Sequence, residues 1–346
     1  MANGVAAQVV GGPSSSKVLT RDLSNKRKLS HAKAGLLWGA FGGMSWGFAG
    51  VVMGIAFAMA PFTGGATIFT GPLVGAAMHD GFAGIFLTLS NIFTGRGSEI
   101  FRTLKTWPGI LVCLAAIFGG PIAMGGYLLG IEFAGASYAL SITAMFPVVG
   151  TIMAAVFLKE KVTPLVWAGI ALSVVGALIV GWTPPEGGSM PHFYLGIGCA
   201  LLACFGWGIE GVLSTFGMDM VDPDIAISIR ESVSCIVSIV GVLPFVAGWA
   251  LLGESLGTFN SLWILACAGV IGGISYLAWY KSLNMTGVGR AMALNITYVI
   301  WGIVFGYFMT DLQLTTNLVV GGLIITIGGV LVVANPKELL NLRQGA

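Results

Sequence analysis

Long apolar stretches, separated by short polar segments, occupy the sequence from residue 35 to residue 335. A transmembrane helix needs about 20 predominantly apolar residues, and we recognise ten stretches of this kind. The pattern therefore predicts an all-α membrane protein with ten transmembrane helices. The predicted helices cover residues 35–60, 68–94, 108–131, 137–158, 163–182, 193–216, 225–251, 260–281, 288–309 and 315–335.

The composition agrees with a membrane protein and excludes a water-soluble domain. Hydrophobic residues make up 56% of the chain and charged residues 9%, with a mean hydropathy of +0.92. Soluble domains carry about 25% charged residues. The 53 glycines suit close packing of membrane helices. The five cysteines fall inside predicted helices without a ligand spacing, so we expect no metal site.

Motifs of common enzymes are missing from the sequence. We find no phosphate-binding loop and no HExxH. We therefore expect no enzymatic activity, no cofactor and no nucleic-acid partner.

Positively charged residues predict the orientation in the membrane. With the N-terminus inside and ten crossings, fifteen of the 16 lysines and arginines fall in inside segments, and the last, Arg230, lies within a span. Cytoplasmic loops carry such an excess. We expect a multi-pass protein of the cytoplasmic membrane with both termini in the cytoplasm.

Two parts of the chain read as copies of one unit. The segment "SWGFAGV" (45–51) aligns with "GWGIEGV" (206–212), and later Gly169 aligns with Gly321 and Gly176 with Gly328. A five-helix unit reverses its direction in the membrane at the second copy. The alignment thus predicts two inverted-topology five-helix repeats, the architecture of secondary transporters.

Five segments follow from this division. Residues 34–182 and 193–335 are the two repeats, and residues 183–192 form an external linker. Residues 1–33 are polar and basic and lack the apolar core of a signal peptide. We expect a disordered cytoplasmic tail there, and a second cytoplasmic tail over residues 336–346.

Several motifs carry a family resemblance. A Trp-Gly pair in the first span, a polar pair early in the second, and the segment "MFPVVGTIMAAVFLKEKVTPLVWAGIALSVVGALIV" resemble the EamA branch of the drug/metabolite transporter superfamily. The blocks "AAMHDG", "GGPIAMGGYLLGIEFAGASYALS", "WGIEGVLSTFGM" and "ISYLAWYKSLN…ALNITYVIWGIVF" resemble LicB-type bacterial choline transporters more closely. The resemblance covers nearly the whole chain except the first tail. It implies a ten-helix transporter that takes up choline or a related quaternary amine.

Three acidic residues, Asp80, Glu210 and Glu231, lie well inside predicted spans. A charge at the bilayer centre costs about 2.5–3.5 kcal/mol on insertion scales, so each must pair, take up a proton or face water. Glu210 lies in mid-span and is our first candidate for substrate binding and proton coupling. His79 and Asp80 are the second candidates for coupling. Asp80, Arg230 and Glu231 also fit a buried polar network between two helices.

Aromatic residues lie at the same depth as Glu210. Trp46 and Trp207 hold equivalent places in the two repeats, which puts them on opposite walls of one cavity. Aromatic faces beside a carboxylate suit a quaternary ammonium ion. An aromatic amino acid or a nucleobase would also stack on such rings, and aromatic residues are common in helix packing. The predicted substrate-binding residues are Trp46, Trp207, Glu210, Tyr276, Tyr280, Asn295, Tyr298 and Trp301.

These features predict a secondary active transporter for a small organic cation, choline-like, working by alternating access. The driving force is the membrane potential or a proton gradient, and a homodimer is left open. An EamA-type exporter of amino acids or other small metabolites is the alternative. A membrane sensor or scaffold that does not transport is the alternative of another class.

Overall fold

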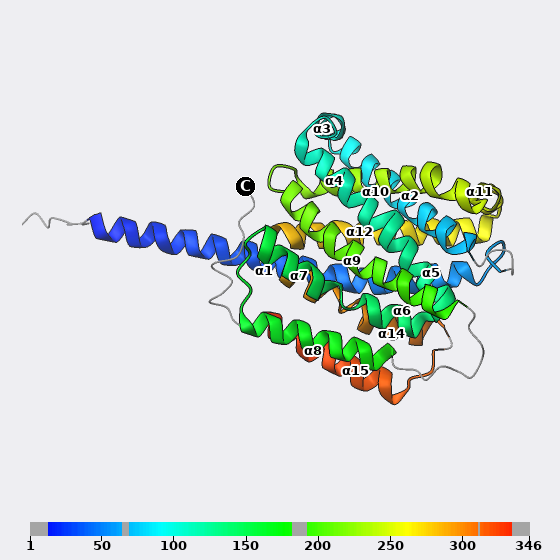
Figure 1. Ribbon diagram of the computed structural model, residues 1–346. Coiled ribbons are helices and arrows are strands. Elements are labelled where there is room, and N and C mark those ends of the chain that lie inside the picture. Colours follow the sequence, from blue (N-terminus) through cyan, green and yellow to red (C-terminus); the bar gives the residue numbers. More distant parts are fainter. Residues whose placement is uncertain (1–12, 64–68, 182–191, 311, 334–346) are drawn as a thin grey trace, which may run out of the picture.

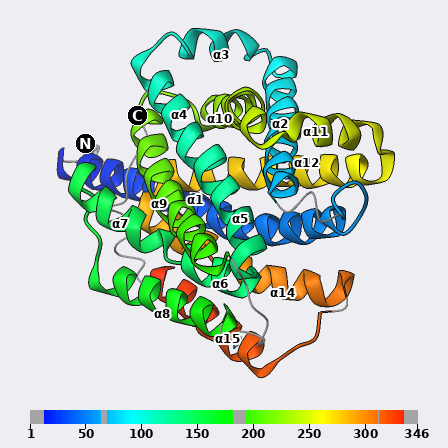
Figure 2. The same cartoon turned by 45° about the vertical axis from the view of Figure 1, so that its right-hand side comes forward.

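The computed structural model is a bundle of helices (Figures 1 and 2). It describes residues 13–63, 69–181, 192–310 and 312–333. These residues form helices and connecting turns, without a strand among them. The helices of the first half are α1 (Pro13–Phe57), α2 (Thr70–Phe93), α3 (Gly97–Thr103), α4 (Trp107–Ile117), a π-helical segment (Phe118–Met124), α5 (Gly125–Ala134), α6 (Ala136–Thr143), α7 (Phe146–Phe157) and α8 (Pro164–Gly181).

The second half is helical as well. Its helices are α9 (Phe193–Gly217), α10 (Pro223–Val237), a π-helical segment (Ser238–Val242), a 3-10 turn (Leu243–Val246), α11 (Gly248–Gly257), α12 (Phe259–Thr286), α13 (Val288–Asn295), α14 (Tyr298–Met309) and α15 (Thr316–Val333).

Seven of the described helical segments are long and apolar enough to cross a membrane, and three shorter apolar helices accompany them. The shorter ones are Phe146–Phe157, Pro164–Val180 and Thr316–Val332. One reason for the difference from ten predicted spans is a turn at Ala144 and Met145, which splits the expected helix 137–158 just before a proline. The chain is thus an all-helical, multi-pass membrane protein.

Helix α1 corrects the expected N-terminal tail. Residues 13–33 are helical and continue into the first span, whereas we expected disorder over residues 1–33. The segment from Ser14 to Ala34 contains no glycine or proline and many good helix formers. Pro13 stands at the first helical position, where proline is favoured. In Figure 1 this part of α1 projects beyond the bundle. Residues 1–12 and the linker and tail segments 182–191 and 334–346 lie outside the described residues.

Helices of the two halves pack against each other throughout the bundle. Helix α1 lies along α12, α2 along α10, α9 along α5, and α8 along α15. Figures 1 and 2 both show the α8–α15 pair at one edge of the bundle. There a Cβ on Gly169 would meet the backbone of Gly328, and one on Gly176 would meet the backbone of Gly321. Small residues let these two helices approach closely, as membrane helices often do.

Candidate functional site

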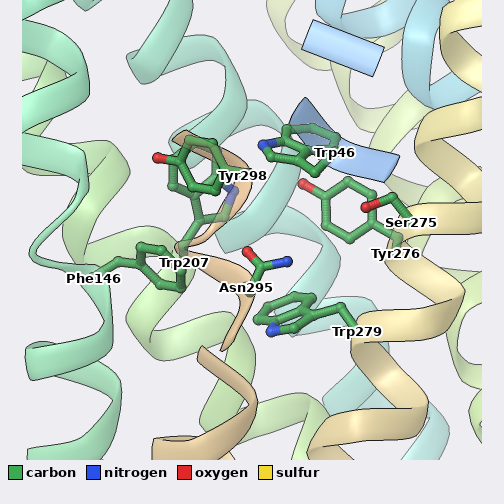
Figure 3. A pocket seen from close by; sticks show the side chains of 8 residues that line it. All are labelled: Trp46, Phe146, Trp207, Ser275, Tyr276, Trp279, Asn295 and Tyr298. Atoms are coloured by element: carbon green, nitrogen blue, oxygen red, sulfur yellow. The ribbon is translucent and has the colours of Figure 1, made fainter. Parts of the chain in front are cut away.

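A cavity lined mainly by aromatic side chains lies where the two halves meet (Figure 3). Its walls come from α1, α7, α9 and α12, and from the junction of α13 with α14. The lining residues are Trp46, Phe146, Trp207, Ser275, Tyr276, Trp279, Asn295 and Tyr298. Both halves of the chain therefore contribute to one cavity.

Ring contacts hold these walls in place. Trp46 meets Tyr276 edge to face with ring centres 5.0 Å apart, and Tyr276 meets Trp279 at 5.9 Å. On the opposite wall, Trp207 contacts Tyr127 at 5.4 Å and Phe146 at 6.1 Å. Such aromatic pairs add stability beyond the area they bury.

The aromatic cavity is small, and a larger one adjoins it. The aromatic cavity encloses about 30 Å³, enough for water but not for a larger ligand without movement of the walls. The neighbouring cavity encloses about 430 Å³ and shares Trp46 and Tyr298 with it. This second cavity, which we call the vestibule, is lined by Trp46, Gly47, Gly50, Val51, Met53, Tyr127, Val180, Tyr298, Val299, Gly302, Ile303, Leu312 and Leu318.

A buried charged network lies directly beside the aromatic cavity, with Arg230 at its centre. The guanidinium donates to Glu210 Oε1 from Nε at 2.7 Å and to Glu231 Oε1 from Nη1 at 2.9 Å. Its Nη1 also lies 3.7 Å from Asp80 Oδ2. All four side chains are almost completely buried. Because isolated charges are so costly in this setting, the four residues must stabilise one another.

Tyr276 connects the network to the cavity. Arg230 donates from Nη2 to the Tyr276 hydroxyl at 3.2 Å, and its guanidinium carbon lies 4.3 Å from the ring centre. The same ring lines the aromatic cavity. A ligand in the cavity would therefore be separated from Arg230 by a single side chain.

A second connection runs through His79. Its Nδ1 lies 3.0 Å from Asp80 Oδ1, and its ring meets Trp46 edge to face with centres 5.7 Å apart. Ser234 donates a hydrogen bond to the other oxygen of Asp80. The Nε2 of His79 and the Oε2 of Glu231 are buried and have no hydrogen-bond partner among the described residues.

Glu210 also accepts a hydrogen bond from Tyr280, whose hydroxyl contacts Ser214 in turn. The hydroxyl of Tyr280 donates to Glu210 Oε1 at 3.1 Å, and Ser214 Oγ lies 2.8 Å from the same hydroxyl. A Cβ on Gly119, in the π-helical segment, would overlap the Glu210 carboxylate. A π-helical segment at this place agrees with their frequent occurrence at functional sites.

A metal ion does not suit this network well. His79, Asp80 and Glu231 offer ligand atoms within 4.8 Å of one another. Arg230, however, already ion-pairs with both carboxylates and would compete with a metal ion for them. We therefore assign no metal to these three residues.

The predicted site residues fall into three groups. Five line the aromatic cavity: Trp46, Trp207, Tyr276, Asn295 and Tyr298. Four, His79, Asp80, Glu210 and Tyr280, belong to the charged network behind it. The structure places Trp301 in neither group, since its ring stacks on Phe305.

Sequence reasoning missed three lining residues, Phe146, Ser275 and Trp279. Trp279 follows Tyr276 by three residues on α12, so helical spacing alone could have identified it. Phe146 and Ser275 carry no comparable signal in a chain this apolar. Arg230 was assigned to a structural network, but its pairing with Glu210 was not predicted.

Comparison with known proteins agrees with this architecture. The model of the EamA-like transporter family matches residues 33–182 and 194–334. Protein LicB of Haemophilus influenzae is 30% identical over 198 residues, which cover 57% of this chain and 65% of LicB. The uncharacterized transporter YoaV of Bacillus subtilis is 21% identical over 206 residues, 59% of this chain and 69% of YoaV.

The fold also has a counterpart among solved structures. A crystal structure of another protein superimposes with a TM-score of 0.68 at 16% identity, over 87% of this chain and 97% of that one. At this identity the likeness concerns the fold alone. The family match, in contrast, covers most of the sequence in two stretches, and members of the family are transporters. The chain therefore belongs to the EamA-like transporter family.

Proposed function

We propose that this transporter carries a small organic cation, choline or a related quaternary ammonium compound, across the cytoplasmic membrane by alternating access. The observation that carries the proposal is the aromatic cavity with buried carboxylates behind it. A quaternary ammonium ion cannot donate hydrogen bonds, and aromatic faces attract it through their quadrupoles. The similarity to LicB, over 65% of that protein, is consistent with the resemblance in sequence motifs.

The charge of the network supports a cationic substrate. Three carboxylates, Asp80, Glu210 and Glu231, surround one guanidinium. A positive ligand beside Tyr276 would compensate part of the excess negative charge at short range and in a low dielectric. An anionic ligand would add to the excess. The network therefore favours cations before any contact is made.

Two inverted five-helix repeats would supply the alternating access. The family model matches the two halves separately. Contacts also recur in pairs: α1 packs on α12 and α14, and α9 packs on the equivalent α5 and α7. Ten crossings result when the split helix α6–α7 and the short helices α8 and α15 also span the membrane. A site between the repeats is typical of such transporters.

The vestibule suggests which side the cavity faces. It is lined by the last turns of α1 and α8 and by Leu312 and Leu318 near the start of α15. These ends are extracellular if both termini are cytoplasmic. We infer that this conformation opens outward. Single cysteines at Gly257 and Gly97 test the orientation, because the first should react with an impermeant thiol reagent from outside and the second from inside.

Coupling to protons is part of the proposal. The membrane potential alone drives a monovalent cation inward by about 2.3 kcal/mol per 100 mV. Glu210 is the first candidate for a proton carrier, and His79 with Asp80 is the second. All three touch the network that a bound cation would influence.

The test is direct. Purified protein is titrated with choline, amino acids and nucleosides, and then reconstituted into liposomes that contain or lack an inside-negative potential. We expect saturable choline binding and uptake that increases with the potential. Binding of amino acids without any binding of quaternary amines would contradict the proposal and favour the alternative of a metabolite exporter.

A further inference from the structure

The indole N–H of Trp207 is a buried hydrogen-bond donor without a partner in the described structure. The residue is 7% exposed and lines the aromatic cavity. An indole nitrogen only donates hydrogen bonds. Buried donors are nearly always paired, so an unpaired one at a cavity wall indicates a missing acceptor.

The orientation of this donor is fixed by its surroundings. The Trp207 ring contacts the rings of both Tyr127 and Phe146. Its neighbour Gly208 packs on Val149 of α7, which restricts the backbone at this position. Figure 3 shows the Trp207 nitrogen on the side of the ring that faces Trp46 across the cavity. An acceptor on a ligand in this cavity would therefore meet the N–H without rearrangement of α9.

Trp279 offers a useful contrast. Its indole N–H is also buried and without a partner in the described structure. In Figure 3, however, this nitrogen is turned away from Asn295. The Cζ2 atom on the same edge of the ring lies 3.7 Å from the position of a Cβ on Gly211. This N–H faces helix α9 rather than the ligand.

We propose that the site selects organic cations that carry a hydroxyl group, and that the Trp207 N–H donates a hydrogen bond to the oxygen of this hydroxyl. The inference rests on the proposed function, because it assumes that the cationic end binds the aromatic walls. A carboxylate would also accept the hydrogen bond. The three buried carboxylates of the network, however, disfavour a ligand that brings a further negative charge close to them. The site thus distinguishes a hydroxylated cation from both a purely alkylated one and a zwitterion.

Three ligands separate these chemistries. Choline has the hydroxyl, propyltrimethylammonium replaces it by a methyl group of similar size, and glycine betaine carries a carboxylate. Binding is measured by calorimetry on the purified full-length protein. We expect choline to bind about tenfold more tightly than propyltrimethylammonium, a difference of about 1.4 kcal/mol. Betaine should bind more weakly than choline.

Two variants assign the effect to one atom. Trp207→Phe keeps an aromatic face and removes the N–H, so the two affinities should come within about twofold of each other. Trp279→Phe makes the same change at the other unpaired indole and should retain the tenfold ratio, whatever it does to the two affinities themselves. Loss of the ratio in Trp279→Phe, or its persistence in Trp207→Phe, would overturn the assignment.

The ligand comparison on the wild-type protein is decisive even where a variant does not fold. Equal binding of choline and propyltrimethylammonium would overturn the selection for a hydroxyl while leaving cation transport intact. Equal or tighter binding of betaine would overturn the exclusion of zwitterions. Failure of every quaternary amine to bind would instead contradict the proposed function itself.

Discussion

Arg230 and Glu210 form an ion pair in the interior of the bundle, with the Arg230 Nε 2.7 Å from the Glu210 Oε1. The two residues come from α10 and α9, and both side chains are inaccessible to solvent. The same guanidinium reaches Glu231, Asp80 and Tyr276. One side chain thus compensates three carboxylates and contacts a wall of the ligand cavity.

Removal of this guanidinium should be strongly destabilising. Arg230→Ala leaves three buried carboxylates without their cation, and breaking a buried pair in this way costs about 3–5 kcal/mol. Arg230→Lys retains the charge but cannot reach as many partners with one ammonium group, so we expect an intermediate loss. Thermal unfolding in detergent measures the loss of stability in both variants.

Arg96 provides the matched control. It pairs with Glu99 and Asp222 at the membrane surface, and its side chain is 30% exposed. Exposed ion pairs contribute about 0–1 kcal/mol. Arg96→Ala should therefore lower stability only slightly. Similar losses for Arg96→Ala and Arg230→Ala would show that the buried network does not stabilise the bundle in the way we describe.

The aromatic wall leads to a prediction about affinity. Trp46→Ala removes a ring that lines both cavities and contacts Tyr276 and His79. We expect quaternary amine binding to weaken by about 1–2 kcal/mol, as for a desolvated cation–π contact. Trp301→Ala is the control, because Trp301 stacks on Phe305 and is not among the lining residues. An equal loss of affinity in both variants would place the ligand elsewhere.

Part of the aromatic cavity could be predicted from sequence, because residues 45–51 align with residues 206–212. The alignment pairs Trp46 with Trp207 and so predicted that the two residues share one cavity, and both line it. The ion pair between Arg230 and Glu210 could not be predicted in the same way. It depends on how α9 and α10 rotate against each other, and periodicity within one helix does not determine that rotation.

Of two helix breaks in the bundle, one could be predicted from sequence and the other could not. Pro147 follows the turn at Ala144 and Met145 and gave a local signal for it. A second turn, at Ile296 and Thr297, has no glycine or proline. Here the Thr297 hydroxyl donates to the Leu294 carbonyl at 2.7 Å, a local bond that competes with the regular helix. Sequence patterns alone do not show when such a bond will prevail.

The contact between α8 and α15 predicts that substitutions of two adjacent glycines, Gly321 and Gly322, differ in their effect on stability. A Cβ on Gly321 would lie 2.6 Å from the Gly176 carbonyl oxygen, whereas nothing lies within 4 Å of one on Gly322. Gly321→Val should therefore force the helices apart and cost about 1–3 kcal/mol, the usual range for overpacking. Gly322→Val adds the same side chain where its Cβ would have no neighbour, so we expect little effect. Thermal unfolding that ranks the two variants equally would contradict this packing.

At the membrane surface, Asp222 should make stability depend on pH. Burial opposes ionisation of this carboxyl group. The hydrogen bonds that it accepts from the Asp224 backbone N–H at 2.9 Å and from Arg96 outweigh that effect, so the pKa of Asp222 lies below its ordinary value. A lowered pKa in the folded state stabilises the protein above the ordinary pKa of about 4, and the contribution disappears as the pH falls below it.

Asp222→Asn isolates this contribution. Asparagine caps the start of α10 about as well as aspartate does, so the variant loses the charge but keeps the cap. At neutral pH and low salt we expect the variant to be less stable by up to about 1 kcal/mol, because the pair with Arg96 is partly exposed. The difference should shrink as the pH falls below about 4, where the aspartate becomes protonated. It should also shrink at 1 M salt, which screens the pair. Thermal unfolding of both proteins across pH measures the difference, and parallel profiles at low salt would exclude Asp222 as the titrating group.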